Sequence, residues 1–408
     1  MKNNSTPRRS SEAAMPFIML TVLIDMIAIG LIIPALPALV GSFTGSPADQ
    51  AYWYGAVTFS FGFSNFLASP LLGALSDHFG RRPLLLLGFL GLSMSFLGTA
   101  LSTSIWGLIA VRIVGGAMQA NAAIANAYVA DITAPERRAK RFGLLGAMMG
   151  LGFIIGPVMG GLLGAIALQL PFFIAGGLAI VNLLYGYFIL PESLAPAQRK
   201  PFRWSAANPA TSIRQLSKLA GVGPLIGVVA FCTLAQFVLY TSWVLYTTFK
   251  FGWGPLENGW SLATVGIVSV VVQGVLLGHL LKHFSAQRLA TIGLVSSMLA
   301  HVLWGLATEG WMMYAVIIAN LFGFTVAASI QSLISSAADS RDQGQTLAAV
   351  ASVGSLMAVL APMFGAPLLG LVSHSPKGDW RIGAPFYFCA ALLAIALYLA
   401  IVHFRRNR

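Results

Sequence analysis

Long apolar segments with very few charges fill most of the chain, and they restrict its fold more than any other feature. Only 9% of the residues are charged, whereas soluble domains carry about a quarter. Each segment is long enough to cross about 30 Å of hydrocarbon as a helix. The sequence therefore predicts an all-α membrane protein with spans at residues 15–41, 51–75, 83–101, 104–130, 141–165, 170–190, 222–249, 258–281, 286–308, 311–337, 344–372 and 382–404.

The spacing of these twelve segments predicts two halves. A tail (1–14) precedes a six-helix half (15–190), and a polar linker (191–221) leads to a second six-helix half (222–408). A weak repeat relates the halves: GHLLKHFSAQR at 278–288 follows the eighth span, where GALSDHFGRRP at 73–83 follows the second. Parallel repeats of this kind are typical of transporters that bind substrate between pseudo-symmetric halves.

The basic residues are distributed unevenly over the two sides of the membrane. The chain has a net charge of +12, and nearly all of its Lys and Arg fall on the side of the termini, the exceptions being Lys250, Lys377, Arg381 and the intramembrane Arg112. By the positive-inside rule, both termini and the linker are expected in the cytoplasm. The charge is thus expected to meet anionic lipid headgroups, and we expect no nucleic-acid partner.

A compact polar hairpin at residues 73–83 joins the second and third spans. Asp77, His78, Arg81 and Arg82 must lie at the water surface, because each charge at the bilayer centre costs about 3 kcal/mol or more. Gly80 allows a tight reversal, and the following proline starts the next helix. An ordinary positive-inside loop is the alternative, although it would not need this order of residues.

Two polar features lie deep in the first half. Asp25 is the only acid of the first span, and an ionised carboxylate is costly there, so it is a candidate proton carrier or, alternatively, a structural hydrogen-bond anchor. In the fourth span, Gln119 and Asn126 follow Arg112 at +7 and +14. A continuous helix places all three on one face, which must meet a cavity or protein, as a functional stripe or as packing contacts. Asn121 points the other way and predicts a bond to a neighbouring helix.

The second half offers amides and aromatic residues as substrate-binding candidates. With Gln119 and Asn126 they suit a large amphiphilic ligand, although Trp243 has the alternative of a membrane-interface anchor. These second-half candidates are Gln236, Tyr240, Trp243, Gln273, Asn320 and Gln331.

The fifth span carries glycines at i+4 spacing, which permit close contact with another helix. The set comprises Gly152, Gly156, Pro157, Gly160 and Gly161. No phosphate-binding loop, nucleophile elbow or metal-ligand spacing is found, so we expect neither an enzyme nor a metal or cofactor. Cys232 and Cys389 lie in apolar segments and indicate no disulfide framework.

Several of these stretches resemble known motifs. GALSDHFGRRP is similar to the signature loop of the major facilitator superfamily, RIVGGAMQA (112–120) to its helix 4 motif and GFIIGPVMGG (152–161) to its antiporter motif. LIDMIAIGLIIPALP (23–37), YVADITAPERRAKRFG (128–143) and FGWGPLENGWSLA (251–263) resemble the bacterial tetracycline/proton efflux antiporters.

The resemblance implies a role for particular residues. Asp25 would couple export to protons with the help of Arg112, and Asp77 and Arg81 would latch a cytoplasmic gate with Asp131. Gln273 matches a glutamine of the drug pathway. The chain departs from the tetracycline exporters at Ser95 and Ser297, where those proteins carry acids.

The sequence and the resemblance together predict a twelve-helix, proton-coupled antiporter. It would act as a monomer in the bacterial inner membrane, exchanging protons for an amphiphilic small molecule or drug by alternating access. Two alternatives stay open: a proton symporter or uniporter of a nutrient, and a sensor with a transporter fold.

Overall fold

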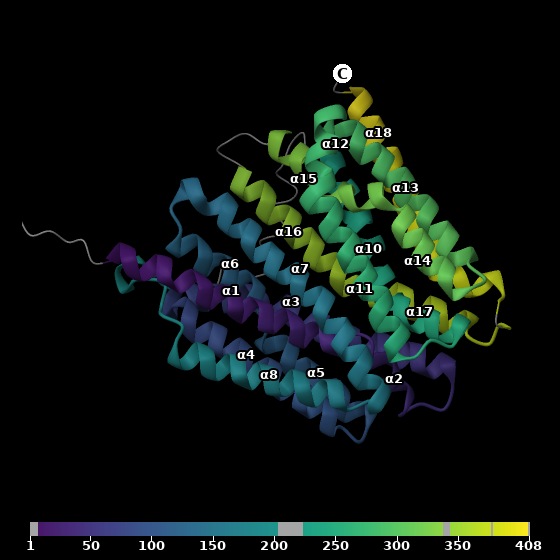
Figure 1. Cartoon of the computed structure of the whole chain (residues 1–408), viewed down its shortest axis with the longest axis horizontal. Helices are drawn as coiled ribbons and strands as arrows, with labels where there is room; N and C mark the ends of the chain where they lie inside the picture. The colour runs from purple at the N-terminus through teal and green to yellow at the C-terminus, as the bar shows by residue number, and fades with distance from the viewer. Residues whose placement is uncertain (1–6, 203–222, 338–342, 377, 407–408) are drawn as a thin grey trace, which may run out of the picture. The chain divides into compact units, whose positions relative to one another are not determined.

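A computed structural model describes residues 7–202, 223–337, 343–376 and 378–406. Within these ranges all regular secondary structure is helical (Figure 1). Ten helical segments of the described ranges are long and apolar enough to cross a membrane, and a bent pair would make eleven. The prediction of an all-α, multi-pass membrane protein is confirmed.

The residues group into two units, one of 1–39 with 60–209 and one of 40–59 with 210–408. Of the predicted tail and linker, residues 1–6 and 203–221 lie outside the described residues. The first helix begins at Pro7, ahead of the expected start at residue 15. Residues 40–59 join the second unit because the early turns of α3 pack on α17, where a Cβ at Gly55 would lie 2.8 Å from that of Ala366.

The first unit contains the helices of the first six expected spans. They are α1 (Pro7–Ile32), α2 (Leu36–Gly41), α3 (Pro47–Phe79), α4 (Arg81–Leu101), α5 (Ile105–Met118), α6 (Asn121–Ile132), α7 (Pro135–Ile166) and α8 (Leu170–Phe188), followed by the short 3₁₀ turn η1 (Pro196–Gln198). The last two residues of α2, at 40–41, and the first turns of α3 belong to the second unit. The core of the first unit includes Ile18, Phe89, Tyr128 and Leu145.

The second unit contains the helices of the other six expected spans. They are α10 (Gly223–Phe251), α11 (Pro255–Val271), the π-helical turn η2 (Val272–Leu276), α12 (Leu277–His283), α13 (Ala286–Leu306), α14 (Gly310–Ala319), η3 (Leu321–Thr325), α15 (Val326–Ala337), α16 (Gln343–Leu360), α17 (Pro362–Val372), η4 (Trp380–Gly383) and α18 (Ala384–Arg406). Its core includes Val238, Leu294, Ile330 and Cys389.

The helices α1 and α7 lie side by side in the first unit (Figure 1). Their contact depends on the i+4 glycines of α7. A Cβ on Gly156 would lie 2.7 Å from the Gly30 Cα, and one on Gly152 would lie 2.5 Å from the Met26 Cβ. Because lipid gives little hydrophobic drive to helix association, such backbone approach is a main source of packing energy. The glycines therefore hold α7 against the helix that carries Asp25.

Several expected spans are interrupted where the sequence predicted continuous helices, among them the first, between Ile32 and Leu36, and the eleventh, at Ala361. The fourth span stops at Met118 and resumes at Asn121, with non-helical dihedrals at Gln119 and Ala120. The tenth span bends by 53° between α14 and the segment that follows Asn320. The predicted stripe through Arg112, Gln119 and Asn126 is therefore wrong, because the 100° step on which it rests does not continue through residues 119 and 120.

Candidate functional site

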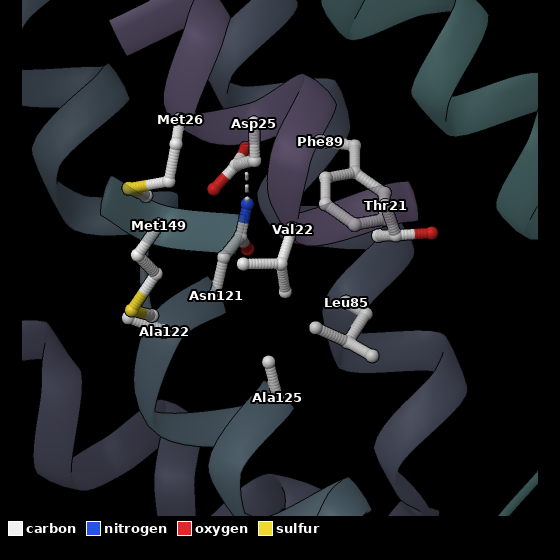
Figure 2. Close-up of a pocket in the computed structure, with 10 residues that line it drawn as sticks. All are labelled: Thr21, Val22, Asp25, Met26, Leu85, Phe89, Asn121, Ala122, Ala125 and Met149. Carbon is white, nitrogen blue, oxygen red and sulfur yellow. Dashed lines mark hydrogen bonds between the residues drawn. The ribbon is translucent and has the colours of Figure 1, made fainter. Parts of the chain in front are cut away.

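A pocket in the first unit surrounds the buried carboxylate of Asp25, which is 5% exposed. Four helices supply its lining, which is mainly apolar: Thr21, Val22, Asp25 and Met26 from α1, Leu85 and Phe89 from α4, Asn121, Ala122 and Ala125 from α6, and Met149 from α7. Figure 2 shows the Asn121 amide nitrogen directed at the carboxylate. The predicted bond from Asn121 to a neighbouring helix is thus present, and its acceptor is Asp25.

The polar groups of this pocket are only partly paired. The Asn121 Nδ2 donates to the Asp25 Oδ1 over 3.2 Å. The buried Thr21 Oγ1 and Asn121 Oδ1 have no hydrogen-bond partner among the described residues. Buried polar atoms are rarely left unpaired without a reason. The Asp25 carboxylate thus has one amide donor beside it, and buried polar atoms with unused hydrogen-bonding capacity lie close by.

Arg112 lies on α5 and is 4% exposed. Its guanidinium carbon is 5.7 Å from the centre of the Phe61 ring on α3, within reach of a cation–π contact. Gln119 lies in the break that follows α5, and Asn126 is exposed on α6 with its amide bonded to the Ala122 carbonyl. The structure thus does not bring these three residues onto one face.

The candidates of the second half lie in different surroundings. Gln236 and Tyr240 are exposed on α10 and hydrogen-bonded to each other, whereas Trp243 is buried, donates to Ser261 Oγ at 2.9 Å and packs edge-on against Trp304. Gln273 is exposed on the π-helical turn η2, a type of turn that is frequent at functional sites. Asn320 is buried and accepts from Ser296 Oγ, and Gln331 is exposed on α15. Their part in substrate binding stays a prediction.

The charged hairpin of the first unit is closely paired. Arg81 contacts Asp77 at 2.5 Å and Asp131 at 3.0 Å, so one guanidinium joins the end of α3 to the end of α6. The same side chain donates to Ser76 Oγ at 2.7 Å. The structure thus brings together the three residues that the sequence assigned to a gate.

Glu192, which the sequence reasoning missed, holds this hairpin from the chain segment after α8. Its carboxylate accepts from the backbone N–H groups of Arg81 at 2.9 Å and Arg82 at 3.2 Å, the first two residues of α4. It also accepts from its own neighbours Ser193 and Leu194. Gly80, with φ of 115°, must be glycine here, and a Cβ would also overlap the Glu192 carboxylate. In the sequence, Glu192 could have been noticed as a single acidic residue in the polar segment that directly follows the apolar span 170–190.

We expect Glu192→Gln to lower the melting temperature of the detergent-solubilised protein. The charge at the N-terminus of α4 contributes about 0.3–1 kcal/mol, and its hydrogen bonds more. Thermal unfolding followed by circular dichroism measures the effect. Glu309→Gln is the matched control, because Glu309 is exposed at the start of α14 and makes no capping bond there. Equal melting temperatures for the two variants would contradict this role of Glu192.

Comparison with known proteins identifies the family. The model of the Major Facilitator Superfamily matches residues 18–362. The class C tetracycline resistance protein of Escherichia coli is 35% identical over 378 residues, covering 92% of this chain and 95% of that protein. The class B protein of the same organism is 32% identical, with 92% and 94% covered. Multidrug resistance protein 2 of Bacillus subtilis is 29% identical, with 93% and 92% covered.

Solved structures share the fold at low sequence identity. The human organic anion transporter MFSD10 (TETRAN) superimposes with a TM-score of 0.70 at 23% identity, covering 96% of this chain and 99% of that one. A bacterial homologue of the lysosomal transporter Spinster reaches 0.75 at 16% identity, with 98% of each chain covered.

Proposed function

Because the chain belongs to the Major Facilitator Superfamily of membrane transporters, we propose that it is a proton-coupled antiporter that exports an amphiphilic small molecule. The observation that carries the proposal is Asp25, a carboxylate buried in a mainly apolar pocket with one amide donor beside it. Intramembrane acids are rare and are typical of proton pathways in pumps and transporters. The names of its relatives, which include tetracycline and multidrug resistance proteins, support export of a drug-like molecule.

In this proposal, Asp25 carries the coupled proton. It takes up a proton from the outer side when substrate leaves and releases it to the cytoplasm when the next substrate binds. Arg112 assists this exchange with its buried positive charge. The contacts of Arg81 with Asp77 and Asp131 hold the cytoplasmic ends of α3 and α6 in a fixed arrangement that serves the gate. The excess of basic residues on one side supports a cytoplasmic location of both termini in the bacterial inner membrane.

A panel of antibiotics and dyes, applied to energised vesicles that contain the purified protein, tests the function. We expect at least one amphiphilic compound to cause proton release that depends on its transport in the opposite direction. Movement of substrate and protons in the same direction would contradict antiport and favour the symporter. Specific binding without any movement would favour the sensor.

The proposal predicts weak or no resistance to tetracycline. The magnesium complex of tetracycline is cationic, and Mg²⁺ prefers hard oxygen ligands such as carboxylates. The positions where the tetracycline exporters carry acids are serines in this chain and supply no carboxylate. Ser95 packs against Gly115 in the contact between α4 and α5, and Ser297 lies on α13 near Gly323. We therefore expect a neutral or weakly charged aromatic amphiphile to be the better substrate.

Growth of an efflux-deficient host at increasing tetracycline concentrations measures the resistance that the protein confers. The minimal inhibitory concentration of tetracycline should rise less than twofold on expression of the protein, with the Asp25→Asn variant as control. Strong resistance that depends on Asp25 would contradict the substrate prediction and leave the antiporter proposal in place.

A further inference from the structure

The break in the fourth span has a capping residue on another helix. Asn65, on α3, directs its amide nitrogen at the backbone carbonyls of the α5 terminus: it donates to the Gln119 carbonyl and lies 3.5 Å from the Gly116 oxygen. The carbonyls at the end of a helix lack partners within the helix. A carbonyl that is left unpaired away from water destabilises the folded protein. Asn65 therefore supplies a side-chain partner to the Gln119 carbonyl, whereas the Gly116 carbonyl also accepts from the Gln119 backbone N–H at 3.2 Å.

The approach of α3 to this point depends on a glycine. A Cβ on Gly116 would overlap the Phe61 carbonyl of α3 and would lie 3.2 Å from the Asn65 backbone nitrogen. The ring of Phe61 lies beneath the Arg112 guanidinium at 5.7 Å. The turn of α3 from Phe61 to Asn65 is thus fitted against the last turn of α5, and the Asn65 side chain has a defined position.

The break decides where the Asn121 side chain points. Gln119 and Ala120 have φ, ψ of −97°, 116° and −141°, 22°, so the rotation of 100° per residue is not carried from α5 into α6, which begins at Asn121. From that first position the Asn121 amide donates to Asp25. Gly88 of α4 leaves the space for it, since a Cβ there would overlap the Asn121 amide oxygen. If the break closed into one continuous helix, Asn121 would rotate away from Asp25.

We propose that Asn65 is a positioning residue for the Asp25 site. By capping the cut end of α5, it keeps the fourth span interrupted, and the interruption in turn keeps the Asn121 amide on the Asp25 carboxylate. Asn65 acts through Asn121 and does not touch Asp25 itself. The importance of this for transport rests on the proposed function, whereas the placement of Asn121 does not.

Infrared difference spectroscopy of the full-length protein tests the placement directly. The carboxyl band that disappears in Asp25→Asn reports the hydrogen bonding of Asp25. We expect this band to shift in Asn121→Ala and, in the same direction, in Asn65→Leu, which keeps the side-chain volume but has no donor. Asn65→Gln, which keeps the amide, should restore much of the original band position. Should Asn65→Leu fail to fold, Asn65→Ala carries the same expectation.

Thr58→Ala provides the control on the same helix. Its hydroxyl donates to the Tyr54 carbonyl of its own helix at 2.8 Å, so its loss should leave the band unchanged. In vesicles, Asn65→Leu should lower the maximal rate of substrate–proton exchange about tenfold, with a small change in the KM for substrate.

The possible outcomes separate this inference from the proposed function. An Asp25 band that is unchanged in Asn65→Leu, or in Asn121→Ala, would overturn the positioning role. A shifted band in a protein that moves no protons would support the positioning role and refute the antiporter. A drop in melting temperature with the band unmoved would reduce Asn65 to a structural residue and also overturn the inference.

Discussion

Replacing Asp25 by asparagine should abolish substrate accumulation driven by a proton gradient while the protein stays folded. The amide has nearly the shape of the carboxylate and can keep a hydrogen bond with Asn121, but it cannot carry a proton. A proton that enters down 100 mV releases about 2.3 kcal/mol, which sustains roughly a 50-fold gradient of a neutral substrate at one proton per molecule. In reconstituted vesicles that contain Asp25→Asn, we expect equal substrate concentrations on the two sides of the membrane.

A second acid-to-amide variant and a binding measurement serve as controls for this prediction. Asp49→Asn replaces an exposed acid at the start of α3 that pairs with the Ser46 hydroxyl, and it should accumulate substrate as the parent does. Binding of substrate to Asp25→Asn, measured by calorimetry, should persist because the substitution leaves the amide and aromatic residues that we expect to contact the substrate unchanged. Gradient-driven accumulation by Asp25→Asn at the parent level would remove Asp25 from the coupling step.

Alanine at Gly156 should strongly destabilise the protein. The new Cβ would lie 2.7 Å from the Gly30 Cα and 2.8 Å from the Ile27 carbonyl oxygen, and backbone atoms cannot rotate away as a side chain can. The helices α1 and α7 must separate, and overpacking of this kind costs about 1–3 kcal/mol or more. Since α1 carries Asp25, the separation should also disturb the pocket. We expect a lower melting temperature in detergent and reduced transport.

Gly146→Ala is a matched control, for which we expect a change in melting temperature of the opposite sign. It lies on the same helix, and its added Cβ would meet nothing within 4 Å. Alanine is favoured over glycine in a helix interior by about 0.5–1 kcal/mol. The melting temperature should therefore rise slightly for Gly146→Ala and fall for Gly156→Ala. A fall of equal size in both variants would contradict the role of the α1 contact, because Gly146 makes no such contact.

The amino-acid sequence alone determined the fold class. Apolar segments of this length with so few charges have one stable form in lipid, since the helix satisfies its own backbone hydrogen bonds. The isolation of Asp25, the charges of the hairpin and the i+4 glycines of the fifth span are equally local features. Each could be read without knowing what lies beside it, because the cost of a charge in lipid and the space around a glycine depend little on the partner.

The tertiary structure decided which residues meet. The sequence placed Asn121 off the polar stripe, but its acceptor, Asp25, and the break that precedes it could not be foreseen from the 3.6-residue period. That break is capped by Asn65, more than fifty positions earlier in the chain. Glu192 likewise binds backbone N–H groups more than a hundred positions away. Every residue except proline has the same backbone N–H and C=O groups, so a side chain that binds a backbone group has no recognisable partner residue in the sequence. Such contacts are found only in the tertiary structure.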